Sequence, residues 1–525
     1  MSDKNESSGL SLLDKGKKNL ISAVFSRMGL IVLLLILQVM FLFGAFRWFT
    51  GFLPHIWGGA VLFSVCMVLY LLNGRLDPTA KITWLVIIML MPMPGALLYL
   101  YTKSDVGHRA LRDRAAQLID LTRSSLPARP ETECSLKKQC PGAAALARYI
   151  GQSGCFPVYA NTEVTYFPLG EAMFSEMLHQ LEQARHFIFL EYFIVDEGLM
   201  WGKILEILAQ KAAQGVEVRV MYDGTCEFST LPRDYPKRLH KLGIQCKAFS
   251  PAMPFVSTHY NYRDHRKILV IDGQTAFTGG VNLADEYINH IVKFGHWKDT
   301  AIMLRGEAVP SFTLLFLQMW NLDVKNPEFS RFIHVPAEPR PEARGFVVPY
   351  GDCPLDRYRV GEQVYIDILN RAVDYVHIMS PYLILDHEME MALIYAAQRG
   401  VDVRLILPGV PDKSAPYGLA FTHYAALLDA GVKIAEYTPG FVHAKVFVCD
   451  DREAVVGTIN LDYRSLYHHF ECAVYLWGTD CISDIRNDFA DTWEKCRMIT
   501  RENLRDIPPV RRLMGIILKP LAPLM

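Results

Sequence analysis

The sequence lacks the cysteine patterns that mark a disulfide framework or a zinc site. Its eleven cysteines include no C-x-x-C pair, and an odd number cannot all pair within one chain. We therefore expect reduced cysteines and a folded part that faces the reducing cytosol. The chain also lacks a charge excess, because its formal net charge is only −1. This balance argues against nucleic acid as a partner, since nucleic-acid binders are strongly basic.

Hydrophobic residues are abundant instead, at 51% of the chain. Three apolar stretches near the amino end, at about 28–49, 54–74 and 82–101, are long enough to cross the roughly 30 Å hydrocarbon core of a bilayer. Basic clusters before the first, after the second and after the third stretch all favour the cytoplasmic side. Two crossings and a re-entrant third stretch, broken at Pro92 and Pro94, satisfy this pattern; a third full crossing is the alternative. The sequence thus predicts a cytoplasmic tail (1–27) and a membrane region (28–103).

One short pattern occurs twice in the second two thirds of the chain. "HRKILVID" at 265–272 and "HAKVFVCD" at 443–450 both read His, any residue, Lys, four residues, Asp. The same offset of 178 residues relates Gly279 to Gly457 and Asn282 to Asn460. A single match has the false-positive risk of any short motif. Two matches with the same following residues indicate a duplicated unit.

The surrounding pattern predicts an α/β fold. Short apolar runs such as "FIFLEYFIV" and "VEVRVMYDG" alternate with amphipathic helices, and "VHIMSPYLIL" and "VDVRLILPG" repeat the order later in the chain. We expect two tandem domains, each a mixed sheet flanked by helices, that form a pseudo-twofold dimer within one chain. Their expected bounds are 141–335 and 347–500, with linkers at 104–140 and 336–346 and a tail at 501–525.

The residue types of the repeated motif predict phosphoryl chemistry at one site between the domains. Two histidines permit a two-step displacement in which one attacks phosphorus and the other acts as acid and base. Two lysines supply positive charge for the non-bridging oxygens. The candidate catalytic residues are the six motif positions His265, Lys267, Asp272, His443, Lys445 and Asp450. The two aspartates lie at odd spacing from the histidines, so we expect structural hydrogen bonding from them first.

Each histidine also needs a partner that fixes its tautomer. Asp299 in "HWKDTAIML" and Glu471 in "HHFECAVYL" are the candidates, because each follows one of the motifs on a predicted strand. The alternative for either residue is an exposed charge on a strand. These residues together demand no metal and no cofactor.

The motifs resemble those of the phospholipase D superfamily, and the chain resembles its bacterial cardiolipin synthases most. The paired His-x-Lys-x4-Asp motif is specific for the superfamily, while the apolar amino-terminal block and "GTINLDYRS" point to the synthases. The resemblance implies phosphatidyl transfer through a phosphohistidine, with His265 as nucleophile and His443 as acid and base. It also implies that both lysines, Asn282 and Asn460 hold the phosphate. The residues alone leave open which histidine is the nucleophile.

The resemblance implies a phosphatidyltransferase of the bacterial inner membrane that converts two phosphatidylglycerol molecules into cardiolipin and glycerol, with its catalytic domains cytoplasmic. The alternatives are a lipid hydrolase or transphosphatidylase that uses another donor or acceptor, such as phosphatidylethanolamine, and a non-catalytic scaffold. The sequence leaves open a protein partner and the oligomeric state. It departs from the family pattern at Asp264, where an amide is expected, at His468 and His469, and by an extra apolar stretch.

The carboxyl-terminal tail, residues 501–525, mixes basic and apolar residues. This composition suits a segment that lies in the headgroup region of a membrane rather than one that crosses it. The alternative is a helix packed on the protein body.

Overall fold

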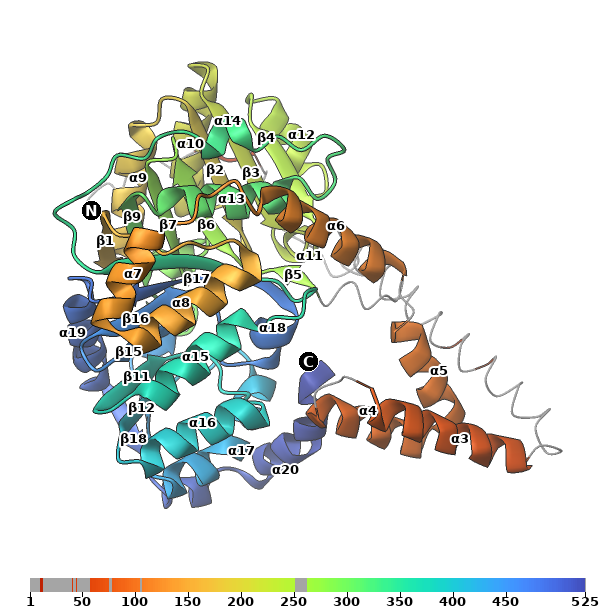
Figure 1. Ribbon diagram of the computed structural model, residues 1–525. Helices are drawn as coiled ribbons and strands as arrows, with labels where there is room; N and C mark the ends of the chain where they lie inside the picture. Colours follow the sequence, from red (N-terminus) through yellow and green to blue (C-terminus); the bar gives the residue numbers. More distant parts are fainter. Residues whose placement is uncertain are drawn as a thin grey trace, which may run out of the picture.

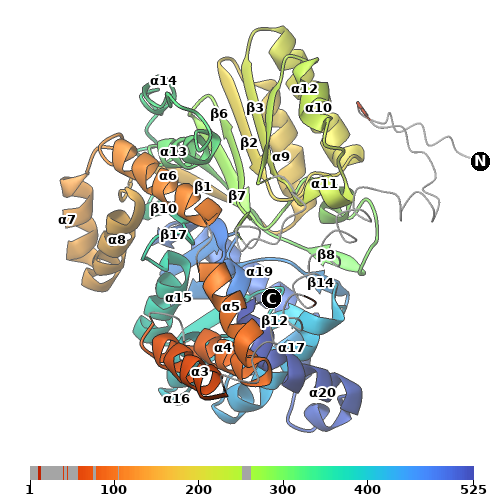
Figure 2. The same ribbon diagram turned by 90° about the vertical axis from the view of Figure 1, so that its right-hand side faces the viewer.

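The structure is a computed structural model that describes residues 10–12, 40, 44, 57–74, 78–103, 106–250 and 262–524. Its main body contains two mixed sheets with helices packed against them (Figures 1 and 2). The first sheet has the strand order β1-β9-β7-β6-β2-β3-β4. The second repeats this order as β10-β17-β16-β15-β11-β12-β13 and adds β18. The predicted α/β fold with two tandem copies is therefore confirmed.

The first copy places its most apolar strands at the centre of its sheet. β2 and β6 are buried at every position, which explains why they appear in the sequence as continuous apolar runs. Its strands are β1 (Thr162–Phe167), β2 (Phe187–Tyr192), β3 (Glu217–Asp223), β4 (Gln245–Phe249), β6 (Lys267–Ile271), β7 (Thr275–Gly279) and β9 (Ala301–Gly306). Its helices are α9 (Gly170–Glu182), α10 (Leu199–Ala213), α11 (Cys226–Ser229), α12 (Tyr235–His240), α13 (Val309–Trp320) and α14 (Ser330–Ile333).

The second copy begins at the end of the stretch expected to be a linker, 336–346. Its strands are β10 (Phe346–Asp352), β11 (Tyr375–Met379), β12 (Asp402–Pro408), β13 (Lys433–Tyr437), β15 (Val446–Cys449), β16 (Glu453–Gly457), β17 (His469–Trp477) and β18 (Cys496–Ile499). Its helices are α15 (Val360–Arg371), α16 (His387–Gln398), α17 (Ser414–Asp429), α18 (Tyr463–Tyr467) and α19 (Ile482–Trp493). Asp386 and Asp462 cap the amino ends of α16 and α18, accepting from Met389 N (2.9 Å) and Ser465 N (2.8 Å).

Two strand pairings between the halves tie them together. β5 (Arg263–Asp264) of the first half pairs with β17 of the second, and β14 (Gly440–Val442) of the second half pairs with β8 (His296–Lys298) of the first. β5 ends at the residue before the first motif histidine, and β14 ends at the residue before the second. The pairing between the halves therefore brings both histidines to the interface. One continuous hydrophobic core, with Ile302 on one side and Val474 on the other, joins the two sheets.

Helices occupy most of the described chain before β1. The segment expected to link the membrane region to the first domain contains α6 (Val106–Thr122) and α7 (Pro130–Gln139), and α8 (Pro141–Gly154) follows. Before them, α3 (Trp57–Leu72), α4 (Pro78–Leu90) and α5 (Pro92–Lys103) form a small helical group with its own core around Trp84 and Tyr99. Figure 1 shows this group apart from the sheets, meeting the rest of the molecule near α20 (Pro509–Leu518).

The expected membrane region differs from the prediction. α3 has 16 residues, α4 has 13 and α5 has 12, and Pro92 begins a new helix where a single long helix would have to continue. Within the residues that the structure describes, no helix has the length and apolar character needed to cross a bilayer. The prediction of a multi-pass protein of the bacterial inner membrane is therefore wrong on this finding. The first apolar stretch, 28–49, lies outside the described residues except for positions 40 and 44.

The carboxyl-terminal segment packs on the second copy and reaches the amino-terminal helices. Gly515 of α20 lies so close to α17 that a Cβ there would be 2.6 Å from the carbonyl oxygen of Gly418. Beyond α20, a 3-10 turn, η4 (Lys519–Leu524), supplies the Pro520 carbonyl that accepts from the Thr83 hydroxyl of α4. The carboxyl end thus connects the helical group to the second copy.

Candidate active site

The first motif histidine is held by the second half of the chain. The backbone N–H of His265 donates to the carbonyl oxygen of Phe470 over 2.9 Å. Its side-chain Nδ1 lies 2.9 and 3.0 Å from the two carboxylate oxygens of Glu471 on β17. A carboxylate can only accept, so Nδ1 carries the ring proton and Nε2 keeps its lone pair.

The second motif histidine is held by the first half in the same way. The N–H of His443 donates to the carbonyl of Lys298 over 2.7 Å, and Nδ1 lies 2.7 Å from Asp299 Oδ2. The sequence proposed Asp299 and Glu471 as partners of the histidines without saying which carboxylate serves which ring. In the structure each carboxylate contacts the histidine of the opposite half, so both halves are needed to complete either pair.

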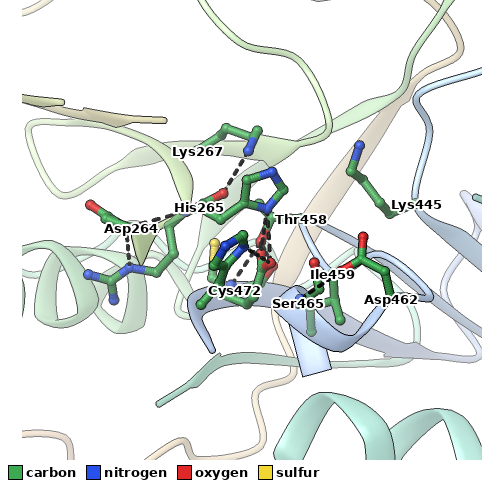
Figure 3. A network of polar contacts seen from close by, with 12 residues as sticks. Asp264, His265, Lys267, Lys445, Thr458, Ile459, Asp462, Ser465 and Cys472 are labelled. Carbon is green, nitrogen blue, oxygen red and sulfur yellow. Dashed lines mark hydrogen bonds and ion pairs between the residues drawn. The ribbon is translucent and has the colours of Figure 1, made fainter. Parts of the chain in front are cut away.

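The two motif lysines lie beside the rings and are almost fully buried, each with 1% of its surface exposed. Figure 3 shows the His265 ring between the side chains of Lys267 and Lys445. Lys267 Nζ donates to the carbonyl of His265 over 2.6 Å. Lys445 Nζ donates to the carbonyl of His443 and lies 2.9 Å from its Nδ1. The site therefore holds two lysine amines next to two imidazoles, where their positive charge can stabilise the non-bridging oxygens of a phosphoryl group.

The two histidine pairs have different protonation properties. Burial opposes the charge of Glu471, but its contact with His265 outweighs this, and the pKa of Glu471 falls below its ordinary value. Burial lowers the pKa of His265 well below its usual range. The first pair is therefore a neutral imidazole that donates to an ionised carboxylate.

Two groups that contact the second histidine have pKa values near neutrality. Burial raises the pKa of Asp299 to about 7 and lowers that of Lys445 to about 7. Burial, followed by the charges of Lys445 and Lys267, lowers the pKa of His443. Asp299 and Lys445, which both contact His443 Nδ1, thus exchange protons near physiological pH, the range that suits acid and base catalysis, while the imidazole itself is neutral there.

The two motif asparagines differ in how their side chains are engaged. Asn282 Oδ1 accepts from Ile194 N at 3.1 Å, and Nδ2 donates to the Tyr287 hydroxyl at 2.8 Å. Asn460 Oδ1 is buried and has no hydrogen-bond partner among the described residues. Asn460 is therefore the less constrained of the two.

The motif aspartates lie away from the histidines, at the far ends of their strands. Asp272 lies five positions after Lys267, or about 17 Å along an extended chain. Asp272 accepts three backbone N–H bonds from residues 185–187 (2.7, 2.7 and 2.8 Å), and Asp450 accepts three from residues 373–375 (2.8, 2.9 and 2.8 Å). Both fix the loop before a central strand, which is a structural function.

Sequence reasoning missed two residues that support the carboxylates. The Thr458 hydroxyl donates to Glu471 Oε2, the oxygen that also contacts His265. Gly280 leaves room for Asp299, because a Cβ there would be 2.0 Å from Asp299 Oδ1. Gly280 and Thr458 are 178 positions apart, the offset that relates the two motifs, so the repeat could have identified them as equivalent positions.

Two of the family departures lie near the site without facing the histidine rings. Asp264, labelled in Figure 3, contacts Arg266, whose Nε is 3.4 Å from Asp264 Oδ1. Nη2 of the same guanidinium is 2.6 Å from Glu191 Oε1. Burial lowers the pKa of His468 to about 4, so its neutral ring donates through Nε2 to the Pro523 carbonyl at 3.1 Å. His468 thus anchors the carboxyl-terminal segment.

Comparison with known proteins places this site in a family. A family model described as "Cardiolipin synthase, PLD-like domain" matches residues 177–295 and 365–493, once in each copy. A cardiolipin synthase of Alkalihalophilus pseudofirmus is 32% identical over 486 residues, which cover 91% of this chain and 95% of the relative. The chain belongs to the cardiolipin synthase family.

Two further comparisons concern a more similar sequence and a solved structure. An uncharacterized protein of Streptococcus mutans is 57% identical to this family member over 458 residues, which cover 87% of this chain and 99% of the relative. A crystal structure of a phosphatidylserine synthase from Haemophilus influenzae superposes with a TM-score of 0.55 at 13% identity, covering 73% of this chain and all of the other. That likeness shows a shared fold.

Proposed function

We propose that this protein is a phosphatidyltransferase that makes cardiolipin from two phosphatidylglycerol molecules and releases glycerol. The observation that carries the proposal is the exchange of carboxylates between the halves. Glu471 holds His265 and Asp299 holds His443, next to two buried lysines. Family membership supports the choice of a phospholipid substrate.

In the first step, His265 is the nucleophile. Its Nε2 attacks the phosphorus of the first phosphatidylglycerol, and a P–N bond forms as the bond from phosphorus to the glycerol oxygen breaks. Ionised Glu471 supports this role, because it stabilises the positive ring that results. His443 gives a proton from Nε2 to the departing glycerol while its Nδ1 takes one from Asp299 or Lys445, and the remaining lysine charge stabilises the non-bridging oxygens.

In the second step, the same groups act in reverse. His443 takes the proton from the terminal hydroxyl of a second phosphatidylglycerol, whose oxygen attacks phosphorus as the P–N bond breaks. The pKa values of about 7 at Asp299 and Lys445 support His443 as the residue that both gives and takes a proton. Either asparagine would bind a phosphate oxygen through its Nδ2 amide, which in Asn282 already donates to the Tyr287 hydroxyl.

Radiolabelled phosphatidylglycerol tests the proposal. The purified full-length protein in lipid-detergent micelles should convert it to labelled cardiolipin with one glycerol released per product, and His443→Ala should not. Phosphatidic acid as the main product would indicate a hydrolase, and the absence of any product would indicate a scaffold. Labelled phosphatidylethanolamine in a parallel reaction tests the alternative donor.

We also propose that α20 holds the protein at the surface of its lipid substrate. Val510, Leu513, Ile516 and Ile517 form one exposed stripe of this helix, on the side opposite Gly515, which packs on α17. The apolar stripe is accompanied by the basic side chains Arg505, Arg511, Arg512 and Lys519. Each cation near an anionic lipid surface contributes about 1 kcal/mol to binding.

A further inference from the structure

His469 has no part in the proposed reaction, yet it lies next to the nucleophile. It opens β17 two residues before Glu471, so both side chains lie on the same face of the strand. Its ring centroid is 5.3 Å from that of His265 and 6.2 Å from that of Phe193. Only 7% of the residue is exposed, and neither ring nitrogen has a hydrogen-bond partner among the described residues. A buried, unpaired polar group of this kind calls for a ligand or another partner.

Three side chains at this place have the chemistry and spacing of a metal site. His265, His469 and Glu471 each offer one ligand atom, and these atoms lie within 4.8 Å of one another. His469 Nδ1 is 3.7 Å from Glu471 Oε1, which is too long for a hydrogen bond. Ligands of tetrahedral Zn²⁺, with bonds of about 2.0–2.1 Å, lie about 3.3 Å apart. Small side-chain rotations therefore bring all three atoms into coordination distance.

We propose that His265, His469 and Glu471 form a binding site for Zn²⁺ or a similar divalent transition-metal ion, and that its occupation stops phosphatidyl transfer. Two imidazoles and one carboxylate with an open fourth position are a known ligand set for this class of ion. The inhibitory part rests on the proposed function, whereas the binding part stands without it.

Inhibition follows from the lone pairs of His265. If the metal binds Nε2, it occupies the lone pair that would attack phosphorus. If it binds Nδ1, the ring proton moves to Nε2 and removes that lone pair. In either case the ring is no longer a nucleophile.

The charges around the site permit a divalent cation. Metal binding requires neutral imidazole rings, and a ring that donates through Nδ1 to a carboxylate, as His265 does, keeps a lone pair on Nε2. The ammonium groups of Lys267 and Lys445 oppose a cation. The carboxyl groups of Glu471 and Asp462 act against this repulsion, and Asp462 interacts electrostatically with both His469 and Glu471. Figure 3 shows Asp462 close to Lys445 on the side of the α18 segment.

Equilibrium dialysis of the full-length protein against buffered Zn²⁺ alone tests the binding. His265→Ala and His469→Gln should each weaken binding of one ion about tenfold or more, because the loss of even an outer partner of a metal ligand costs that much. His443→Ala and His468→Gln are the matched controls, since they remove nearby buried histidines outside the cluster, and they should bind as the parent does. Excess Mg²⁺, which prefers oxygen ligands, should not compete. Cysteine thiols give the same background in every variant.

Inhibition provides the second measurement. Zn²⁺ should stop cardiolipin formation by the parent, a chelator should restore it, and His469→Gln should need about tenfold more Zn²⁺ for half-inhibition relative to its own metal-free rate. If His469→Gln has a lower melting temperature than the parent, His469→Leu replaces it in both experiments, because leucine fits the contacts with the neighbouring rings. Unchanged dialysis in both His469 variants would overturn the metal site while leaving the enzyme intact. A protein that makes no cardiolipin but shows the predicted dialysis pattern would refute the proposed function alone.

Discussion

Glu471→Gln removes one charge beside His265 and keeps the shape of the side chain. The carboxylate oxygens lie 2.9 and 3.0 Å from His265 Nδ1, and Glu471 has no exposed surface. The ring becomes positive when Nε2 bonds to phosphorus. Two charges about 4 Å apart attract by roughly 4 kcal/mol at an effective dielectric constant of about 20. Because each 1.36 kcal/mol changes a rate about tenfold, we expect phosphoenzyme formation to slow by about three orders of magnitude.

Asp299→Asn is the matched control for this experiment. Burial raises the pKa of Asp299 to about 7, so it carries only part of a charge at neutral pH, and we expect a smaller loss. The loss should also shrink for a phosphodiester whose leaving group needs no proton, because His443 acts on that proton. Single-turnover labelling by phosphatidyl-radiolabelled substrate, quenched in alkali to preserve phosphohistidine, measures the first step directly. Equal losses in folded samples of both variants would refute the electrostatic argument.

Four other perturbations separate the remaining parts of the mechanism and fold. His443→Asn should trap an acid-labile phosphoenzyme on His265, and label recovered on residue 443 of the parent would reverse the assignment. Gly280→Ala should abolish most activity, because its Cβ would displace Asp299; a fully active variant would show that the carboxylate tolerates movement. Replacing the four basic residues of the α20 segment with glutamine should raise the apparent KM for lipid in vesicles and leave turnover of a short-chain soluble analogue unchanged, whereas equal losses would indicate a structural effect. Burial raises the pKa of Asp352 from 3.8 to about 7, so the stability that its neutral form gives is lost as pH rises from about 4 to 7. Asp352→Asn, which does not titrate but lacks the second oxygen that accepts from Val360 N or Gly361 N, should therefore lose less resistance to urea than the parent between pH 4 and pH 8; equal losses would contradict this.

The sequence predicts the repeated fold well because its signals are local. β2 and β6 are apolar except for Glu191 and Lys267, and their counterparts β11 and β15 recur in the same order. The long-range pairing of β5 with β17 was not predictable, since a two-residue strand has no periodicity. This pairing nevertheless decides where His265 lies.

The site shows the same limit. The candidates Asp299 and Glu471 followed from their positions after the motifs, but the exchange between halves depends on contacts 144 and 206 residues apart in sequence. The hydrogen bond from Asn282 to Tyr287 could not be predicted either, because the sequence does not indicate which side chains form hydrogen bonds with each other. At the amino end, hydrophobicity suggested long helices, but Pro92 limits α4 and α5 to 13 and 12 residues.

The exchange of carboxylates also restricts how this protein can change over generations. In two independent domains, one copy could lose its function while the other retained it. Under the proposed mechanism, a mutation of Glu471 in one half disables the histidine of the other, so each half is under selection for a reaction that its partner's ring performs. Both copies of the motif are consequently kept intact by a single requirement, and any lineage that separates the two halves into different genes must keep their products together.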